Sequence, residues 1–178
     1  QQLFMIEAAK YNVFPMDDRM TERENPKEAG RLDLHGDRDS ITFHGPGLRL
    51  TEETAPNVKN RSFTITAEVE VPEGGANGVI VAQGGRFGGW SFYVTDGKPS
   101  YAYNYFGLSV QKITAPQPLP PGRHEVVFDF SYQGGGVGRG GTGRLLVDGE
   151  KVAQGQIEAT IPYYFAFDET FDVGCDRA

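Results

Sequence analysis

The stretch LLVDGEKVA, residues 145–153, decides the fold of this chain. An Asp-Gly pair stands between two short apolar runs, which is a strong signal for a β-hairpin with a two-residue turn. Both central residues of a type I′ turn adopt positive φ, which aspartate tolerates and glycine adopts freely. The same arrangement occurs at Asp96-Gly97, between residues 92–94 and 101–103. Two such hairpins in a glycine-rich chain indicate an antiparallel β-sheet protein.

Short stretches in which apolar and polar residues alternate fill the chain from residue 40 onward. In residues 62–71, the apolar side chains share one face and the threonines and glutamates share the other, as in a half-buried strand. Turns rich in glycine and proline separate the stretches, as in β-sandwiches and jelly rolls. Further strands are expected at residues 79–83, 90–95, 101–106, 109–113, 124–132, 143–147, 151–157 and 170–173.

The turn at Asp96-Gly97 sets the register of its hairpin. It pairs Thr95 with Lys98, and the pairing then continues along both strands. Four aromatic side chains form one cross-strand ladder in this register: Trp90, Phe92, Tyr101 and Tyr103. Such a ladder is either part of the core, which we favour, or a platform on which sugar rings stack.

The composition excludes several classes of protein. The net charge of −7 argues against binding to a nucleic-acid backbone, which needs clustered lysines and arginines. No apolar run approaches the roughly 18 residues that cross a bilayer, so we expect no membrane partner. The one cysteine, Cys175, cannot form an internal disulfide or a cysteine-based zinc site, and it leaves the cellular compartment undecided.

The N-terminal residues differ from the rest of the chain. Residues 2–11 are expected to form the only helix, Pro15 ends it, and residues 16–30 form a charged connecting segment. A helix this short with a narrow apolar stripe is not stable alone, so it needs another surface to cover. We therefore divide the chain into residues 1–39, helix and linker, and residues 40–178, a β-sandwich domain.

Two segments are candidate sites. Arg86 and Phe87 stand between two glycine pairs, and such a loop can present a cation and a ring to a ligand or to a neighbouring domain. Carboxylate oxygens are calcium ligands, so an acidic run near the C-terminus is either a metal site or, more simply, a solvated edge. That run contains Asp168, Glu169, Asp172 and Asp176.

Catalytic motifs are missing from the sequence. The G-x-G-x-x-G match at residues 136–141 lies between two expected strands with no helix after it, so we interpret it as a hairpin loop. The chain has neither the E-x-D-x-x-E strand motif of sandwich glycosidases nor a G-x-S-x-G nucleophile elbow. We expect no catalytic residue and no cofactor in this chain.

Several blocks of the sequence resemble the C-terminal region of bacterial arylsulfatases. They are NRSFTITAEV (60–69), GVIVAQGGRFGGWS (78–91), YNYFG (103–107), LPPG (119–122) and FDVG (171–174), with EAAKYNV (7–13) similar to the last helix of the sulfatase core. The resemblance implies a concanavalin- or laminin-G-like β-sandwich that accompanies a catalytic domain. Sulfate-ester hydrolysis by the whole enzyme would use a formylglycine and a calcium ion, both in that catalytic core and neither in this chain.

The resemblance also implies partners. We expect the sandwich to pack on its own catalytic sulfatase domain and to line the substrate entrance through Arg86, Phe87 and Tyr105. The full set of candidate ligand-contact or domain-contact residues is Arg86, Phe87, Trp90, Tyr103 and Tyr105. Members of the family continue past Gly174, so we expect an open sheet edge that allows a homodimer. The alternative function is an autonomous carbohydrate-binding, lectin-like module, in which part of the aromatic ladder would be exposed.

Overall fold

The computed structural model describes residues 1–16, 30, 32, 34–36 and 38–176. The chain divides into two compact units, Gln1–Gly36 and Asp37–Ala178. The first unit contains the helix, and the second contains the strands. The predicted connecting segment, residues 16–30, lies almost wholly outside the described residues.

The helix of the first unit is α1 (Gln2–Lys10), which ends one residue before the predicted end at Tyr11. Its buried residue is Ala8. No helix among the described residues is long and apolar enough to cross a membrane. Four large apolar side chains on α1 are exposed, which agrees with the expectation, still a prediction, that it needs a further surface: Leu3, Phe4, Met5 and Ile6.

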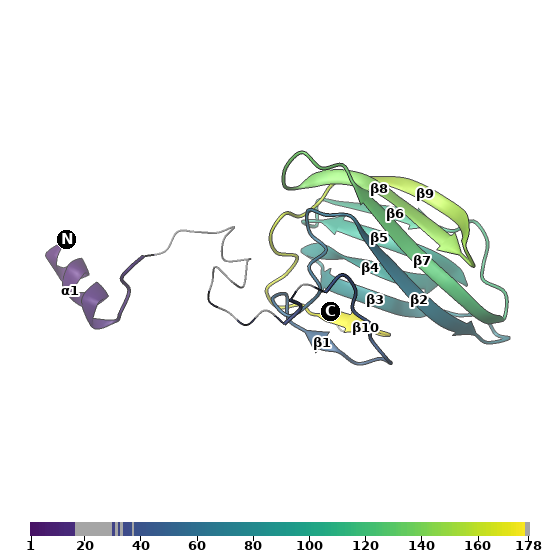
Figure 1. Ribbon diagram of the computed structural model, residues 1–178, viewed down its shortest axis with the longest axis horizontal. Coiled ribbons are helices and arrows are strands. Elements are labelled where there is room, and N and C mark those ends of the chain that lie inside the picture. Colours follow the sequence, from purple (N-terminus) through teal and green to yellow (C-terminus); the bar gives the residue numbers. More distant parts are fainter. Residues whose placement is uncertain (17–29, 31, 33, 37, 177–178) are drawn as a thin grey trace. The chain divides into compact units, whose positions relative to one another are not determined.

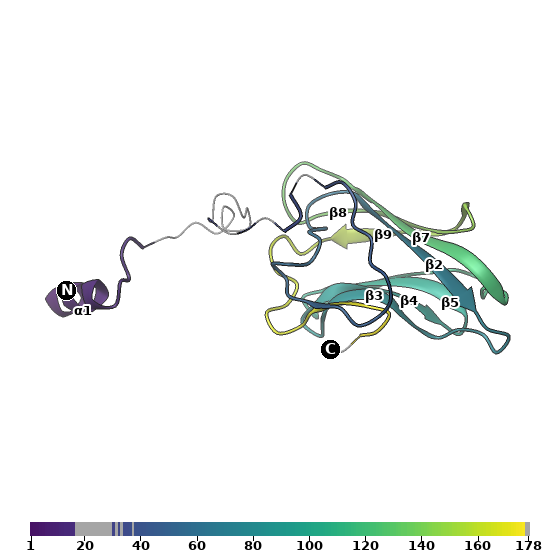
Figure 2. The ribbon, with the colours of Figure 1, turned by 60° about the horizontal axis from the view of Figure 1, so that its bottom comes forward.

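The second unit is a sandwich of two antiparallel sheets, which Figures 1 and 2 show from two directions. One sheet has six strands in the order β1-β10-β3-β4-β5-β6, and the other has four in the order β2-β7-β8-β9. The strands are β1 (Arg49–Leu50), β2 (Phe63–Val71), β3 (Gly78–Gly85), β4 (Gly88–Thr95), β5 (Lys98–Tyr105), β6 (Ser109–Thr114), β7 (Gly122–Tyr132), β8 (Arg139–Val147), β9 (Glu150–Ala159) and β10 (Phe171–Val173). The predicted antiparallel β-sandwich is confirmed, and every expected strand is found. β1 was not predicted, because two residues are too few to show alternation.

The two Asp-Gly turns have the predicted geometry. In the β4–β5 hairpin φ is 50° at Asp96 and 73° at Gly97, and in the β8–β9 hairpin it is 50° at Asp148 and 82° at Gly149. Positive φ at both central residues gives a turn whose twist matches that of the flanking strands. The G-x-G-x-x-G match lies in the β7–β8 hairpin as expected, with residues 136–138 in the loop and residues 139–141 already in β8.

The aromatic ladder of β4 and β5 faces the core between the sheets. Phe92 lies opposite Tyr101, and Trp90 lies opposite Tyr103, as the turn register predicts. The Tyr101 ring stacks on Phe128 of β7, with 3.5 Å between ring centroids and 6° between ring planes. None of the four ladder side chains is more than 4% exposed. The core interpretation of the ladder is therefore confirmed, and a sugar platform on these rings is excluded because none of them reaches solvent.

Glycines bring the two sheets close together next to β6. A Cβ added at Gly143 would lie 2.6 Å from the Cδ1 of Ile113, and one added at Gly155 would lie 2.8 Å from its Cγ1. Such distances are far shorter than an ordinary carbon–carbon contact. Ile113 therefore packs directly on the backbones of β8 and β9.

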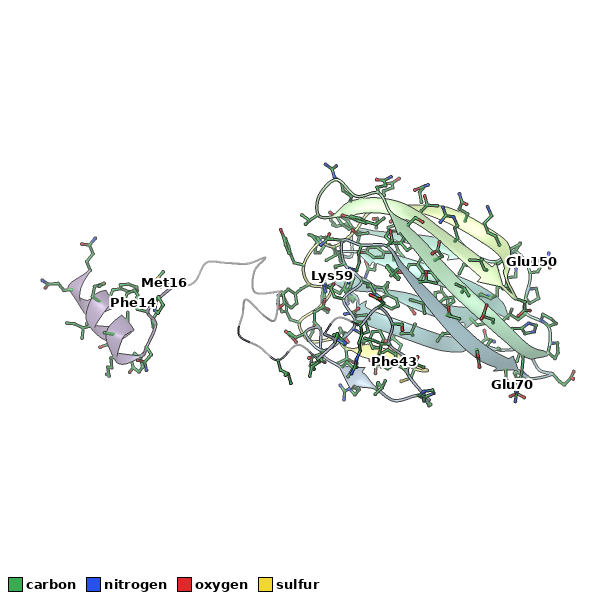
Figure 3. The ribbon with its side chains drawn as sticks, in the orientation of Figure 1. Phe14, Met16, Phe43, Lys59, Glu70 and Glu150 are labelled. Atoms are coloured by element: carbon green, nitrogen blue, oxygen red, sulfur yellow. The ribbon has the colours of Figure 1, made fainter. Side chains whose placement is uncertain are left out.

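His124 links three segments at the end of the sandwich that carries the β8–β9 turn. Its Nδ1 lies 2.7 Å from an oxygen of Asp148, and its Nε2 lies 3.0 Å from the carbonyl oxygen of Pro120. Because both partners accept, only the protonated ring donates to both. The hydrogen bond to Asp148 is the main cause that raises the pKa of His124 above 6.5. Figure 3 shows Glu150 at this end of the sandwich and Lys59 at the other.

Candidate functional site

The end of the sandwich opposite the β8–β9 turn gathers the β3–β4, β5–β6 and β7–β8 turns and the segment 160–170; we call it the loop end. The backbone N–H of Ile161 donates to the Tyr103 hydroxyl at 2.6 Å, which joins the segment to the six-stranded sheet. The N–H of Thr160 donates to the Gly138 carbonyl at 3.2 Å, which joins it to the β7–β8 loop. The loop end therefore includes turns from both sheets.

Asn104 fixes two of these turns relative to each other. Its Nδ2 donates to the carbonyl oxygens of Gly85 at 2.8 Å and Arg86 at 2.9 Å. Its Oδ1 accepts from the backbone N–H of Gly107 at 2.9 Å. Gly107 has a φ of 69°, and a Cβ at this position would lie 3.2 Å from the Arg86 carbonyl oxygen. A glycine therefore suits both the backbone conformation and the close approach of the two turns.

A second asparagine, Asn60, joins the other loops. Its Nδ2 donates to the Pro162 carbonyl at 2.7 Å, and its Oδ1 accepts from the N–H of Gly138 at 2.8 Å. The Tyr132 hydroxyl donates to the Gly136 carbonyl at 2.6 Å, which holds the β7–β8 loop from the other side. Side-chain hydrogen bonds thus fix the loop end, although its backbone is irregular.

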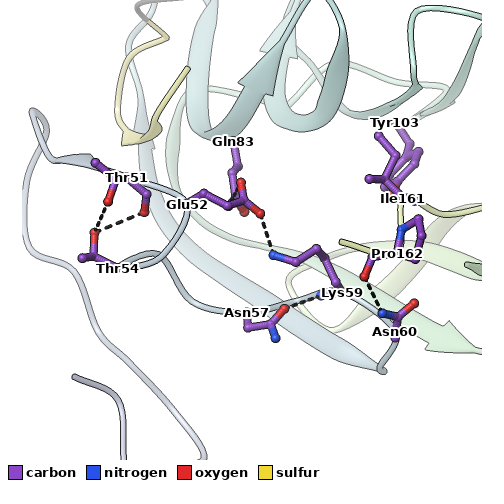
Figure 4. Close-up of polar contacts among 10 residues, drawn as sticks. All are labelled: Thr51, Glu52, Thr54, Asn57, Lys59, Asn60, Gln83, Tyr103, Ile161 and Pro162. Atoms are coloured by element: carbon purple, nitrogen blue, oxygen red, sulfur yellow. Dashed lines mark hydrogen bonds and ion pairs between the residues drawn. The ribbon is translucent and has the colours of Figure 1, made fainter. Parts of the chain in front are cut away.

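An enclosed ion pair lies beneath the loop end, as Figure 4 shows. The Nζ of Lys59 lies 2.5 Å from Glu52, and the two side chains are 7% and 6% exposed. Gln83 of β3 donates to the second oxygen of Glu52 at 3.1 Å, and Lys59 lies 5.2 Å from the ring centroid of Phe165. Burial raises the pKa of the neighbouring Tyr103 hydroxyl well above its usual value. These charges hold segment 51–60 on the sandwich and are not presented to a ligand.

Several exposed side chains of the loop end are large and apolar. Leu108 is 81% exposed and Phe167 is 90% exposed. Single exposed apolar residues are ordinary, but a group of them at one place is typical of an interaction site. Among the described residues of the sandwich unit, every exposed large apolar side chain lies on these turns or beside them on β6, and we call this group the apolar patch: Phe87, Phe106, Leu108, Val110, Val137 and Phe167.

Residues 45–175, which include all ten strands, match the family described as the concanavalin A-like lectin/glucanases superfamily, Laminin_G_3. The chain belongs to this superfamily. No curated protein matches the chain. Among solved structures, it is similar to the heptameric SAP-like pentraxin from Limulus polyphemus, with 17% identity and a TM-score of 0.36. The match covers 65% of this chain and 60% of that chain, which is less than two thirds of the pentraxin.

Membership of the concanavalin A-like superfamily confirms the concanavalin- or laminin-G-like fold that the resemblance implied. The superfamily is a broader assignment than the arylsulfatase C-terminal region that the sequence blocks suggested. The description of the superfamily names no sulfatase, so an arylsulfatase parent rests on those blocks alone.

The structure separates the five predicted contact residues into two groups. Arg86 and Phe87 form the β3–β4 turn, where Phe87 is 70% exposed and the guanidinium lies 5.9 Å from its ring centroid. Tyr105 is half-buried, and its ring lies 4.9 Å from that of Phe106. The prediction of Trp90 and Tyr103 as contact residues is wrong, because both point to the inner face of their strands and are 4% exposed.

The four carboxylates of the acidic run do not come together in one cluster. Asp172 of β10 is buried, and it accepts a hydrogen bond from Thr170 at 2.5 Å. Asp168 and Asp176 are exposed and Glu169 is half-buried. No group of three or more His, Cys, Asp or Glu that could hold a metal ion occurs in the part of the chain that the structure describes. The structure therefore does not bring these four carboxylates together around a calcium ion.

Most of the apolar patch was missed from the sequence. The signal was present at Phe106-Gly107-Leu108, where large apolar residues flank a turn glycine at positions that a hairpin leaves in solvent. The ion pair of Glu52 and Lys59 left no such signal. Glu52 and Lys59 lie between β1 and β2, outside any strand, and only tertiary contacts enclose them.

Proposed function

We propose that this chain is a non-catalytic accessory domain that packs on the catalytic domain of an arylsulfatase through the apolar patch. The observation that carries the proposal is the gathering of exposed apolar side chains at one end of the sandwich. The sequence blocks at residues 60–69, 78–91 and 103–107 support the choice of a sulfatase as the parent enzyme.

Docking through the apolar patch gains free energy from apolar burial and loses little conformational entropy. Burying an exposed phenylalanine or leucine side chain contributes about 1.5–3 kcal/mol, so a few members of the patch can hold two domains together. Turns that are already fixed, as Asn104 fixes the β3–β4 and β5–β6 turns, lose little conformational entropy on docking. The patch is therefore suited to a lasting contact between domains.

The first test is binding in trans. A purified bacterial arylsulfatase catalytic domain, cut after its last core helix, is titrated with this chain by isothermal calorimetry. We expect binding by the wild type and at least a tenfold loss in Leu108→Asp, which places a charge in the patch. Glu150→Ala, at the opposite end of the sandwich, is the matched control and should bind like the wild type. The proposal fails if the catalytic domain does not bind, or if Leu108→Asp binds as tightly as the control.

The second test is activity. The purified chain alone should not hydrolyse an aryl sulfate such as 4-nitrophenyl sulfate. Turnover that stays with the chain through a second purification would contradict an accessory role.

A carbohydrate-binding, lectin-like module is the second candidate. The description of the superfamily as lectins and glucanases favours it, as do the exposed rings of the patch. Phe167 stacks on Tyr164 with 5.1 Å between centroids, and aromatic faces of this kind can stack on sugar rings. A glycan array decides between the candidates. Binding that is lost in Phe167→Ala would favour the lectin, and an array without bound glycans would favour the accessory domain.

A further inference from the structure

The edge strand β2 (Phe63–Val71) differs from the other sheet edges. It pairs with β7 through nine consecutive residues without a bulge. No backbone hydrogen bond among the described residues joins β2 to any segment besides β7. Figure 1 shows it as the outermost strand of the four-stranded sheet. One long row of its backbone N–H and C=O groups is therefore open to pairing.

Proteins commonly blunt sheet edges with short strands, bulges, lysines or prolines. β1 has two residues, and β6 carries Lys112. The β8–β9 ladder shifts register between Leu145 and Leu146, and β9 carries Lys151. β2 has none of these features. Of the four edges, it is the one that combines a long strand with neither a bulge nor a lysine, and its only charged side chains are Glu68 and Glu70.

The inner face of β2 is also incompletely covered. Ile65 and Ala67 are half-buried, although they lie opposite Phe128 and Val126 of β7, which are fully buried. The core therefore reaches the side of the sandwich at β2. A further strand placed alongside β2 would cover these side chains.

We propose that β2 pairs with β2 of a second copy of this chain, so that the two four-stranded sheets join into one. Antiparallel pairing about a two-fold axis at Ala67 is the register in which all nine residues pair. It places Ile65 of one copy opposite Val69 of the other on the inner face. This is the isologous contact expected of a two-fold dimer, with the same strand contributed by both copies.

The charges on the outer face of β2 fit this register. Glu68 of one copy faces Thr66 of the other, and Glu70 faces Thr64. No two carboxylates lie directly opposite each other across the new pair, although β2 carries two glutamates. A second copy can therefore pair along the whole of β2 without directly opposed carboxylates.

The experiment measures molecular mass by light scattering at protein concentrations from about 1 µM to 1 mM. This range detects a dimer whose Kd lies between about 1 µM and 1 mM. We expect the wild type to approach twice its monomer mass of 19.5 kDa as concentration rises. Thr66→Glu places a carboxylate opposite Glu68 of the other copy on both sides of the axis, and should raise the Kd at least tenfold. Thr66→Gln, a matched variant with the same side-chain length but no charge, should leave the Kd close to that of the wild type.

Gln154→Glu on β9 is the control for added negative charge at another edge, and should behave like the wild type. Circular dichroism checks that each variant keeps its strands. A wild type that stays at 19.5 kDa over the whole range overturns the proposal. A dimer that Thr66→Glu and Thr66→Gln weaken equally, or that Gln154→Glu weakens as much, also overturns it, because the added charge would not lie at a contact along β2.

Discussion

Breaking the ion pair between Glu52 and Lys59 should destabilise the sandwich far more than breaking a surface pair. Both side chains are less than 10% exposed, and their nearest charged atoms are 2.5 Å apart. Lys59→Met leaves the Glu52 carboxylate enclosed, with Gln83 as its remaining hydrogen-bond donor in Figure 4. Glu52→Leu leaves the Lys59 ammonium enclosed beside the ring of Phe165.

The expected loss of unfolding free energy follows from the burial of the two charges. Removing one partner of a buried pair costs about 3–5 kcal/mol, because the remaining charge is desolvated without compensation. An exposed pair would cost at most about 1 kcal/mol. The double variant Glu52→Leu/Lys59→Met removes both charges, so it should cost at least 2 kcal/mol less than the sum of the two single variants, which is roughly the coupling of contacting residues. A domain that is stable by about 10 kcal/mol, the middle of the usual range, should still fold with either change.

The assay is urea unfolding at neutral pH, followed by the fluorescence of Trp90, which is the only tryptophan and is 4% exposed. Unchanged slopes with denaturant would show that the variants alter stability and not the extent of unfolding. A single variant that costs less than about 1 kcal/mol would refute the reasoning, because the pair would then behave as a solvated one. A double variant that costs the full sum would also refute it, because the two charges would not be coupled.

Three further predictions concern other parts of the sandwich. Asn104→Ala removes three hydrogen bonds between the β3–β4 and β5–β6 turns, so it should cost about 2–3 kcal/mol and speed hydrogen exchange in those turns, which mass spectrometry measures. The raised pKa of His124 means that its stabilising contact is complete below pH 6.5 and is lost as pH rises through the raised value. The melting temperature of His124→Gln should therefore fall below that of the wild type at about pH 5.5 and approach it at about pH 9, and a difference that grows with pH would contradict the protonated contact with Asp148. Gly143→Ala should cost about 1–3 kcal/mol in urea unfolding by overpacking against Ile113, and Ile113→Val in the same chain should recover part of that loss.

Local chemistry in the sequence was enough to predict the strands and the hairpin registers. The Asp-Gly turn at residues 148–149 and its counterpart at 96–97 each need positive φ at two positions, and both have it. Because the side-chain period of a strand is two, the turn at 96–97 also fixed that Trp90 lies opposite Tyr103. The same alternation separated the inner and outer faces of residues 62–71.

Tertiary structure alone decided the order of the strands, the four edges and the surface of the loop end. Trp90 and Phe87 are three residues apart in one glycine-rich block, yet one lies in the core and the other in solvent. Glu52 and Lys59 become an enclosed pair only where segment 51–60 meets β3 and Phe165. Alternation and turn geometry act between neighbouring residues and can be read along the chain. Enclosure depends on contacts between segments far apart in sequence, which no local pattern records.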